Sequence, residues 1–249
     1  MVKQIRLGVL VPSSNTALEP ITQEIISSIS DDDLEITVHF SRFTVKEISL
    51  TPTALNQFKL EPIITAAQLL ADAKVDCIGW SGTSAGWLGF DHDERLCKEI
   101  SDATGISCAT STLALNKALK LLGIGEGSKL GLVTPYLSDV QTAIMEKYAG
   151  IGIVIDKSVE RHLEISANHS IRQVSAEQLG SMVREVKEGG AHVITTFCTN
   201  LVAARYAEQW EREMDVVVLD TVATVVWDML KMVGVDTKKV QGWGKMFEL

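Results

Sequence analysis

The sequence has no long apolar run and no cluster of lysine and arginine residues. Without about eighteen consecutive apolar residues, it contains no candidate membrane-spanning helix. Its formal net charge of −9 and its isoelectric point near 5.1 disfavour nucleic acid or an anionic membrane as the main partner. The apolar run at residues 7–11 is too short for the core of a signal peptide, and Pro12 ends it. We therefore expect a cytoplasmic protein that binds small ligands.

Cysteine and histidine are also sparse, with four and five residues respectively. No two cysteines form a C-x-x-C pair, and their wide scatter argues against both a zinc knuckle and a disulfide framework. The histidines lack the H-E-x-x-H spacing of a zinc site. The stretch "DHDER" at residues 91–95 starts a predicted helix, where a solvated acidic turn is the expected structure. The sequence therefore predicts no metal site.

What the chain does have is a regular alternation of short apolar runs and amphipathic segments. With 46% hydrophobic residues over 249 positions, it can bury a sizeable core. Strands are predicted at residues 7–11, 34–40, 75–80, 106–109, 130–133, 151–155, 192–197 and 216–219. Helices are predicted at residues 18–29, 53–73, 94–104, 111–122, 138–149, 175–188, 201–213 and 221–232. This repeated alternation is typical of α/β proteins with a mostly parallel sheet flanked by helices.

The two halves of the chain resemble each other. "RLGVLVPSSN" near the start is echoed by "KLGLVTPYLS", and "VDCIGWSGTS" is echoed by "AHVITTFCTN". A third echo, "GISCATSTLAL" with "MDVVVLDTVAT", follows in the same order and favours a duplication. We predict two pseudo-symmetric α/β halves, residues 1–122 and 128–249, joined by a glycine-rich connection. The last helix and the C-terminal tail are expected to cross back onto the first half.

Polar and small residues follow the predicted strands, at the points where ligands bind in open α/β sheets. Four such strand ends would surround one cleft between the halves: residues 12–15, 81–84, 134–136 and 197–200. In the repeat, Gly82 of the first half is the counterpart of Cys198 in the second, so one half offers a thiol where the other offers no side chain. Strand-end amides and a following helix N-terminus favour a Cys198 pKa tuned toward neutrality, which suits an acid or a base.

Several motifs carry a family resemblance over essentially the whole chain. In order, they are "LGVLVPSSNT", "GTS", "ATSTLALNKALKLLGI", "LVTPYLSDV", "FCTNL" and "GWGKMF". Together they resemble the maleate cis-trans isomerase and arylmalonate decarboxylase branch of the aspartate/glutamate racemase superfamily. The resemblance implies an enzyme without cofactor or metal, with its active site between two α/β halves. Such enzymes carry out carbanion or proton-transfer chemistry beside a carboxylate. Whether the chain forms a homo-oligomer stays open.

The resemblance assigns different motifs to different members of this branch. "GTS" at residues 82–84, together with Cys198, matches the decarboxylase pattern, in which only the second cysteine is kept. Asn15 in "PSSNT" and Asn168 match two carboxylate-binding asparagines of the isomerases. Tyr136 is shared by both groups. The sequence therefore combines a decarboxylase-like catalytic pair with isomerase-like carboxylate binding.

The candidate catalytic positions are Cys198 and Gly82, the latter as the place of the absent first cysteine. Loss of a proton or of CO2 beside a carboxylate leaves an enediolate, which needs several hydrogen-bond donors. The candidate residues for binding the oxyanion or the carboxylate are Pro12, Ser14, Asn15, Thr83, Ser84, Tyr136, Asn168, Thr199 and Asn200. Trp80 and Trp87 either line the cleft or pack the sheet, and packing is the more common role of such residues.

Three functions are compatible with these residues. The leading hypothesis is a lyase that decarboxylates a small malonate-like or unsaturated dicarboxylic acid, because protonating the carbanion needs a single acid, Cys198. A maleate-type isomerase or an Asp/Glu-type racemase would need a second participant, which Gly82 does not supply. The third hypothesis is a non-catalytic protein that binds carboxylates. Restoring the thiol with Gly82→Cys is expected to create or raise racemase or isomerase activity.

Overall fold

The structure of the protein is a computed structural model, which describes residues 2–249. The strands are β1 (Lys3–Pro12), β2 (Leu34–Phe43), β3 (Cys77–Trp80), β4 (Cys108–Thr110), β5 (Gly131–Val133), β6 (Glu160–Arg161), β7 (Val193–Thr196) and β8 (Val217–Asp220). The α-helices are α1 (Leu18–Ser27), α2 (Pro52–Leu55), α3 (Leu60–Asp72), α4 (Ala85–Leu88), α5 (Phe90–Thr104), α6 (Ser111–Leu121), α7 (Ser138–Ala149), α8 (Asn168–Ile171), α9 (Ala176–Glu188), α10 (Ala207–Met214) and α11 (Thr221–Met232). Short 3₁₀ turns are η1 (Asn56–Phe58), η2 (Ala204–Tyr206), η3 (Thr237–Lys239) and η4 (Lys245–Glu248).

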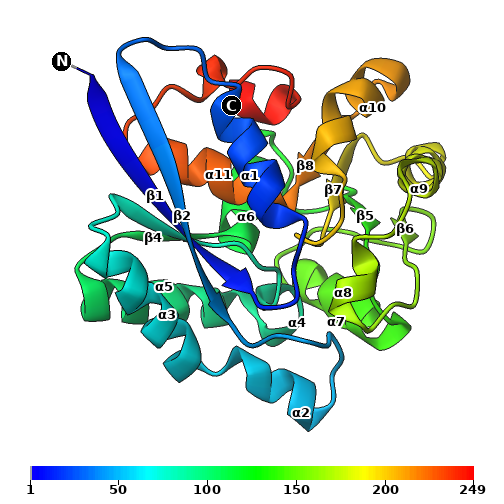
Figure 1. Cartoon of the computed structure of the whole chain (residues 1–249). Coiled ribbons are helices and arrows are strands. Elements are labelled where there is room, and N and C mark those ends of the chain that lie inside the picture. The colour runs from blue at the N-terminus through cyan, green and yellow to red at the C-terminus, as the bar shows by residue number, and fades with distance from the viewer. Residues whose placement is uncertain (1) are drawn as a thin grey trace.

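The strands form two four-stranded parallel sheets, in the orders β2-β1-β3-β4 and β6-β5-β7-β8. Strand order follows chain order in the same way in both sheets, and helices flank them (Figure 1). Parallel strands need crossover helices, which shield the sheet from water. All four residues of β3 and all four of β7 are accordingly buried. The predicted α/β class, with parallel sheets flanked by helices, is confirmed.

Helix α11 joins the two sheets. It follows β8 of the second sheet but packs against α6, β3 and α1 of the first half (Figure 1). The hydroxyl of Thr224 donates to the carbonyl of Ser111 over 2.9 Å. A Cβ on Gly79 would lie 2.3 Å from the sulfur of Met229, so glycine is needed for this close approach. The chain after α11 contacts both halves. The backbone N–H of Gln241 donates to the hydroxyl of Ser28 in the first half, whereas η4 packs against β8 of the second sheet. The division at residues 122 and 128 stays a prediction.

The strand predicted at residues 151–155 is wrong. Gly152 has φ +81°, a turn conformation, and the side chains of Ile151 and Val154 are exposed. Val154 forms only an isolated bridge with Lys129. The strand that pairs with β5 is instead β6. Its sequence is the charged pair Glu160–Arg161, so the apolar pattern of a buried strand does not predict it.

The helix predicted at residues 53–73 is interrupted. It divides into α2, η1 and α3, and Lys59 between the last two has extended backbone angles. Pro62 lies in the first turn of α3, where its missing N–H breaks no helical hydrogen bond. The proline therefore marks the start of a helix rather than its interior.

The acidic turn at residues 91–95 is only partly solvated. Asp91 is exposed, but Asp93 on the inner face of α5 is fully buried, and burial raises the pKa of its carboxyl. Its two oxygens have no hydrogen-bond partner among the described residues. No helix within residues 2–249 combines the length and apolarity needed to span a membrane.

Candidate active site

The loops that follow β1, β3, β5 and β7 converge on one small pocket. Its free volume is about 20 Å³, which is room for about one water molecule. The strand ends contribute Pro12, Asn15, Trp80, Gly82, Thr83, Ser84, Tyr136, Cys198 and Thr199. The remaining wall residues are Val45, Ile48, Phe58, Trp87 and Asn168. The residues predicted at four strand ends thus meet at one place.

Asn15 ties the first half to the second. Its side-chain oxygen accepts from the backbone N–H groups of Ala17 and Leu18 over 2.9 and 3.0 Å, which satisfies donors at the start of α1. Its amide group donates to the hydroxyl of Thr199 over 3.1 Å. That hydroxyl in turn donates to the carbonyl of Ser81 over 3.2 Å. Asn15 therefore both caps a helix and fixes the two strand-end loops against each other.

Cys198, Tyr136 and Thr83 form a connected group in the pocket wall. The hydroxyls of Thr83 and Tyr136 are hydrogen-bonded over 2.7 Å, and the Tyr136 hydroxyl acts to lower the pKa of the Cys198 thiol. The sulfur of Cys198 accepts from the backbone N–H of Asn200 over 3.4 Å. All three side chains are buried. The wall thus holds a proton-bearing thiol beside two hydroxyl groups.

The expected tuning of the Cys198 pKa toward neutrality is wrong in direction. Burial raises the pKa of Cys198 to about 11, although the Tyr136 hydroxyl and backbone N–H groups act to lower it. Burial also raises the pKa of Tyr136 well above its usual range. The strand-end amides that the sequence predicted are present, but removal of the thiol from water outweighs them. At neutral pH Cys198 is therefore a thiol, suited to giving a proton.

Asn168 reaches the pocket, whereas Ser14 and Asn200 lie behind its wall. Asn168 begins α8, and its side-chain amide donates to the hydroxyl of Ser14 over 2.9 Å. The Asn200 side chain accepts from the backbone N–H groups of Thr16 and Ala17 over 3.1 and 3.2 Å. Ser14 and Asn200 are thus engaged with the protein itself and hold the wall residues in place.

Residues 44–58, which we name the covering segment, close one side of the pocket. They connect β2 to α3, and Val45, Ile48 and Phe58 line the cavity from this side. The backbone N–H of Ile48 donates to the carbonyl of Ser166 over 2.9 Å, which docks the segment on the second half. The three wall residues make this side of the pocket apolar. The sequence offered no periodic signal for Val45 and Ile48, because they lie outside regular elements.

Trp80 and Trp87 line the pocket as well as packing the core, so both of the roles that the sequence left open apply. Trp80 lies against Phe43, with ring centroids 5.0 Å apart, and Trp87 lies edge-on to Tyr136 at 5.4 Å. Within residues 2–249, neither indole N–H has a hydrogen-bond partner, and the same holds for the hydroxyl of Ser84. Buried polar groups are normally paired, so these three groups are available to a ligand.

The indole of Trp80 takes the place of a side chain at residue 82. A Cβ on Gly82 would lie 2.1 Å from Cζ2 and 2.4 Å from Cε2 of Trp80. Real Cβ atoms essentially never approach another heavy atom so closely. Gly82 is therefore required by the position of the ring, and the expected gain of a working thiol from Gly82→Cys alone is sterically blocked.

The pocket wall is uncharged. Among the described residues, it contains no lysine, arginine, histidine, aspartate or glutamate, and its titratable groups are Cys198 and Tyr136. No three His, Cys, Asp or Glu side chains within residues 2–249 gather closely enough to hold a metal ion. Any carboxylate bound here meets hydroxyl, amide, indole and thiol groups rather than a cation.

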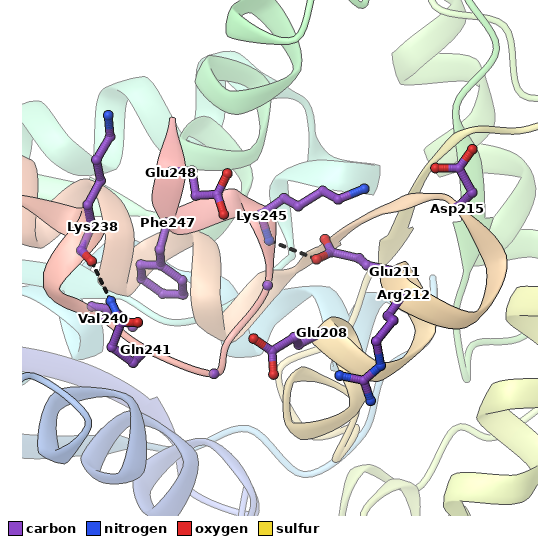
Figure 2. A pocket seen from close by; sticks show the side chains of 12 residues that line it. Glu208, Glu211, Arg212, Asp215, Lys238, Val240, Gln241, Lys245, Phe247 and Glu248 are labelled. Carbon is purple, nitrogen blue, oxygen red and sulfur yellow. Dashed lines mark hydrogen bonds between the residues drawn. The ribbon is translucent and has the colours of Figure 1, made fainter.

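A larger pocket of about 860 Å³ lies between α10 and the C-terminal segment (Figure 2). Charged side chains of both signs line it, among them Glu208, Arg212 and Lys238. Its buried carboxylate, Glu211, accepts from the backbone N–H groups of Val218 and Lys245 over 2.9 and 2.8 Å, so it fastens the C-terminal segment to the second sheet. The strand-end donors and the thiol lie in the smaller pocket, which is the better candidate for chemistry.

Comparisons with known proteins agree with this arrangement. The chain is 23% identical over 244 residues to the maleate isomerase of Geobacillus stearothermophilus, covering 95% of each protein. It is 23% identical over 203 residues to the arylmalonate decarboxylase of Bordetella bronchiseptica, covering 80% of this chain and 82% of that one. Its fold matches a mutant maleate cis-trans isomerase of Nocardia farcinica with a covalently bound succinylcysteine intermediate, with a TM-score of 0.87, 22% identity and 98% coverage of both chains. A model of the arylmalonate decarboxylase family matches residues 17–247. The resemblance drawn from the sequence motifs is confirmed, and the chain belongs to the arylmalonate decarboxylase family.

Proposed function

We propose that the protein is a cofactor-independent lyase that decarboxylates a small malonate-like dicarboxylic acid, with Cys198 as the proton donor. One observation carries the proposal. Among the described residues, the pocket wall contains a single thiol, that of Cys198, and its other titratable group is the phenol of Tyr136. Racemisation by two bases needs a proton donor on each face of the substrate. Decarboxylation needs no base, because the electron pair comes from the breaking carbon–carbon bond, and it needs one acid.

The reaction balances with these groups. The bond between the α-carbon and the leaving carboxylate breaks, neutral CO2 departs, and the electron pair spreads onto the retained carboxylate as an enediolate. The S–H bond of Cys198 then breaks as its proton forms a C–H bond with the α-carbon. Water reprotonates the thiolate, so each turnover consumes one proton. The raised pKa of Cys198 supports this acid role, because the thiol form prevails at neutral pH.

The wall offers separate surroundings for the two carboxylates. Thr83, Tyr136 and the unpaired hydroxyl of Ser84 provide donors for the charge that develops on the retained carboxylate. Removing one such donor typically costs about 3 to 4 kcal/mol of barrier. The apolar residues Val45 and Ile48 would face the carboxylate that leaves. A carboxylate placed against apolar groups is destabilised, and loss of CO2 removes that cost.

A maleate-type isomerase is the second candidate, because Asn15 and Asn168 both belong to the pocket wall. These are the positions at which the sequence resembles the isomerases, and the relative from Geobacillus stearothermophilus is a maleate isomerase. Isomerisation through a covalent adduct would require Cys198 to attack as a thiolate. The raised pKa of this thiol disfavours that form at neutral pH.

The deciding experiment incubates the enzyme in D2O with malonate, methylmalonate, maleate and aspartate, followed by NMR. Release of CO2 from methylmalonate with one deuterium at the α-carbon of propionate is the expected result, and Cys198→Ala should abolish it. Cys97→Ser is the matched control, since Cys97 is a free thiol outside the pocket wall. Conversion of maleate to fumarate without CO2 release would establish the isomerase instead. Binding of these acids without turnover would leave a carboxylate-binding protein.

A further inference from the structure

Trp80 occupies a distinctive place in the pocket. It is the last residue of β3, and its indole lies over Gly82, where a side chain would otherwise extend. The contact involves the ring system itself, because the nearest atoms to a Cβ on Gly82 are Cζ2, Cε2 and Cη2, at 2.1, 2.4 and 2.5 Å. The ring also packs against Phe43, with centroids 5.0 Å apart, and the residue is 1% exposed. An indole packed in this way is a fixed part of the wall.

The indole N–H of Trp80 is a buried donor without an acceptor among the described residues. Leaving such a donor unpaired costs about 1 to 3 kcal/mol, and fixed groups that carry this cost are common at ligand sites. The nitrogen is bonded to Cε2, the atom 2.4 Å from a Cβ on Gly82, so it lies close to Gly82, and both residues line the pocket. A bound ligand with an oxygen acceptor would pair it.

We propose that Trp80 is a specificity-determining residue, whose indole N–H binds a carboxylate oxygen of the substrate while the ring closes the Gly82 side of the pocket to any second proton donor. The choice of a carboxylate rests on the proposed function. The closure does not, because it follows from the space that the ring fills. With this side closed, the proton reaches the α-carbon from Cys198 alone, so a prochiral substrate gives a single enantiomer of the product.

Two other tryptophans provide internal comparisons. Trp87 also lines the pocket with an unpaired N–H, but its ring is held edge-on between Phe58 and Tyr136, with centroids 5.9 and 5.4 Å away. It lies at the side of the covering segment rather than over Gly82. Trp227 has an equally buried and unpaired N–H, but it belongs to α11 and is not part of the pocket wall. Trp227 therefore matches Trp80 in burial and differs in access to a ligand.

The test follows the indole N–H resonances of the ¹⁵N-labelled full chain while malonate and methylmalonate are added. The resonance that Trp80→Phe removes is assigned to Trp80, and Trp87→Phe and Trp227→Phe assign their own. We expect the Trp80 resonance to move downfield in a saturable way and the Trp227 resonance to stay in place. A shift of the Trp87 resonance alone, or saturable binding with a stationary Trp80 resonance, overturns the proposal. Absence of binding by both acids overturns it as well.

Affinity and substrate size supply a second readout. Trp80→Phe removes the N–H together with part of the indole, and Trp227→Phe makes the same truncation away from the pocket. Malonate should therefore bind about tenfold to hundredfold more weakly to Trp80→Phe, while Trp227→Phe binds as the wild type does. Trp80→Leu should admit larger malonates, such as phenylmalonate, that the wild type rejects. A Trp80 shift without CO2 release would support carboxylate binding by the Trp80 indole and refute the proposed decarboxylation. CO2 release without a Trp80 shift would support decarboxylation and refute the role of Trp80.

Discussion

The indole of Trp80 covers Gly82, so that a Cβ on residue 82 would lie 2.1 Å from the ring. In the sequence, Gly82 marks the place of an absent cysteine. In the folded protein, the indole of Trp80, two residues earlier, fills that place. With Trp80 in this position there is no room for a thiol at residue 82, so the glycine and the tryptophan depend on each other.

Gly82→Cys should destabilise the protein without giving a second acid. Overpacking of this kind costs about 1 to 3 kcal/mol, so the melting temperature should fall by about 2 to 10 °C. Adding Trp80→Leu should recover most of this loss and expose the new thiol. The double variant should exchange the α-hydrogen of propionate with D2O, which calorimetry and NMR check together. A stable, exchange-competent Gly82→Cys single variant would contradict the steric argument.

Cys198→Ser should lower kcat by about 10²- to 10⁴-fold, because a positioned acid contributes about that much. In the wild type the active form is the protonated thiol, whose pKa is raised to about 11. Activity should therefore be retained from pH 7 to 9 and fall as the pH rises toward 11. A pH–rate profile and the thiolate absorbance of the wild type against Cys198→Ser check this. An activity that rises with pH through this range would instead indicate a nucleophilic thiolate.

Tyr136→Phe and Thr83→Val should each lower kcat by about 10²- to 10³-fold, since each removes a donor to the developing oxyanion. Their hydroxyls are hydrogen-bonded over 2.7 Å, so each orients the other. The double variant should lose less than the product of the two single losses. A double-mutant cycle on kcat measures this coupling, and strictly multiplicative losses would show that the two groups act independently.

Asp220→Asn should stabilise the protein at neutral pH. Burial raises the Asp220 pKa from 3.8 to about 6, although the carboxyl accepts from Thr196 and from the first N–H groups of α11. A raised folded-state pKa means that stability is fully present below pH 3.8 and is lost as the pH rises through 6. This group therefore costs roughly 2 kcal/mol at pH 7 relative to pH 4.

Asparagine keeps the acceptor for the helix and has no charge to bury. The unfolding free energy of Asp220→Asn relative to wild type should therefore increase between pH 4 and pH 7, as urea titrations at both pH values can measure. An unchanged difference would show that Asp220 is charged without penalty.

Gln57→Ala should loosen the covering segment. The side-chain oxygen of Gln57 accepts from the backbone of Lys46 over 2.6 Å, and its amide donates to the carbonyls of Glu47 and Ala54, both over 3.0 Å. With a free volume of only about 20 Å³, the pocket has to open before a dicarboxylate enters. We expect faster hydrogen exchange confined to residues 44–58 and a severalfold higher KM. Exchange that increases throughout the protein would indicate general destabilisation instead.

The sequence predicted most of the fold because buried parallel strands are short, apolar and branched, and that signal is local. Helices α7 and α11 were predicted with the bounds that the structure shows. The prediction failed where a local rule was broken. The two-residue strand β6 is charged, and its buried Glu160 is accommodated by a hydrogen bond from Gln141 over 3.0 Å, a partner that no local pattern reveals.

The sequence by itself determined the alternation of strands and helices, the repeat, and the pairing of Gly82 with Cys198 as corresponding strand ends. These depend on residue order and periodicity. Only the tertiary structure decided the direction of the Cys198 pKa, because desolvation depends on everything packed around the thiol. It also decided that Trp80 fills the space above Gly82, since a side chain's direction follows from the packing of its neighbours rather than from its position in the chain.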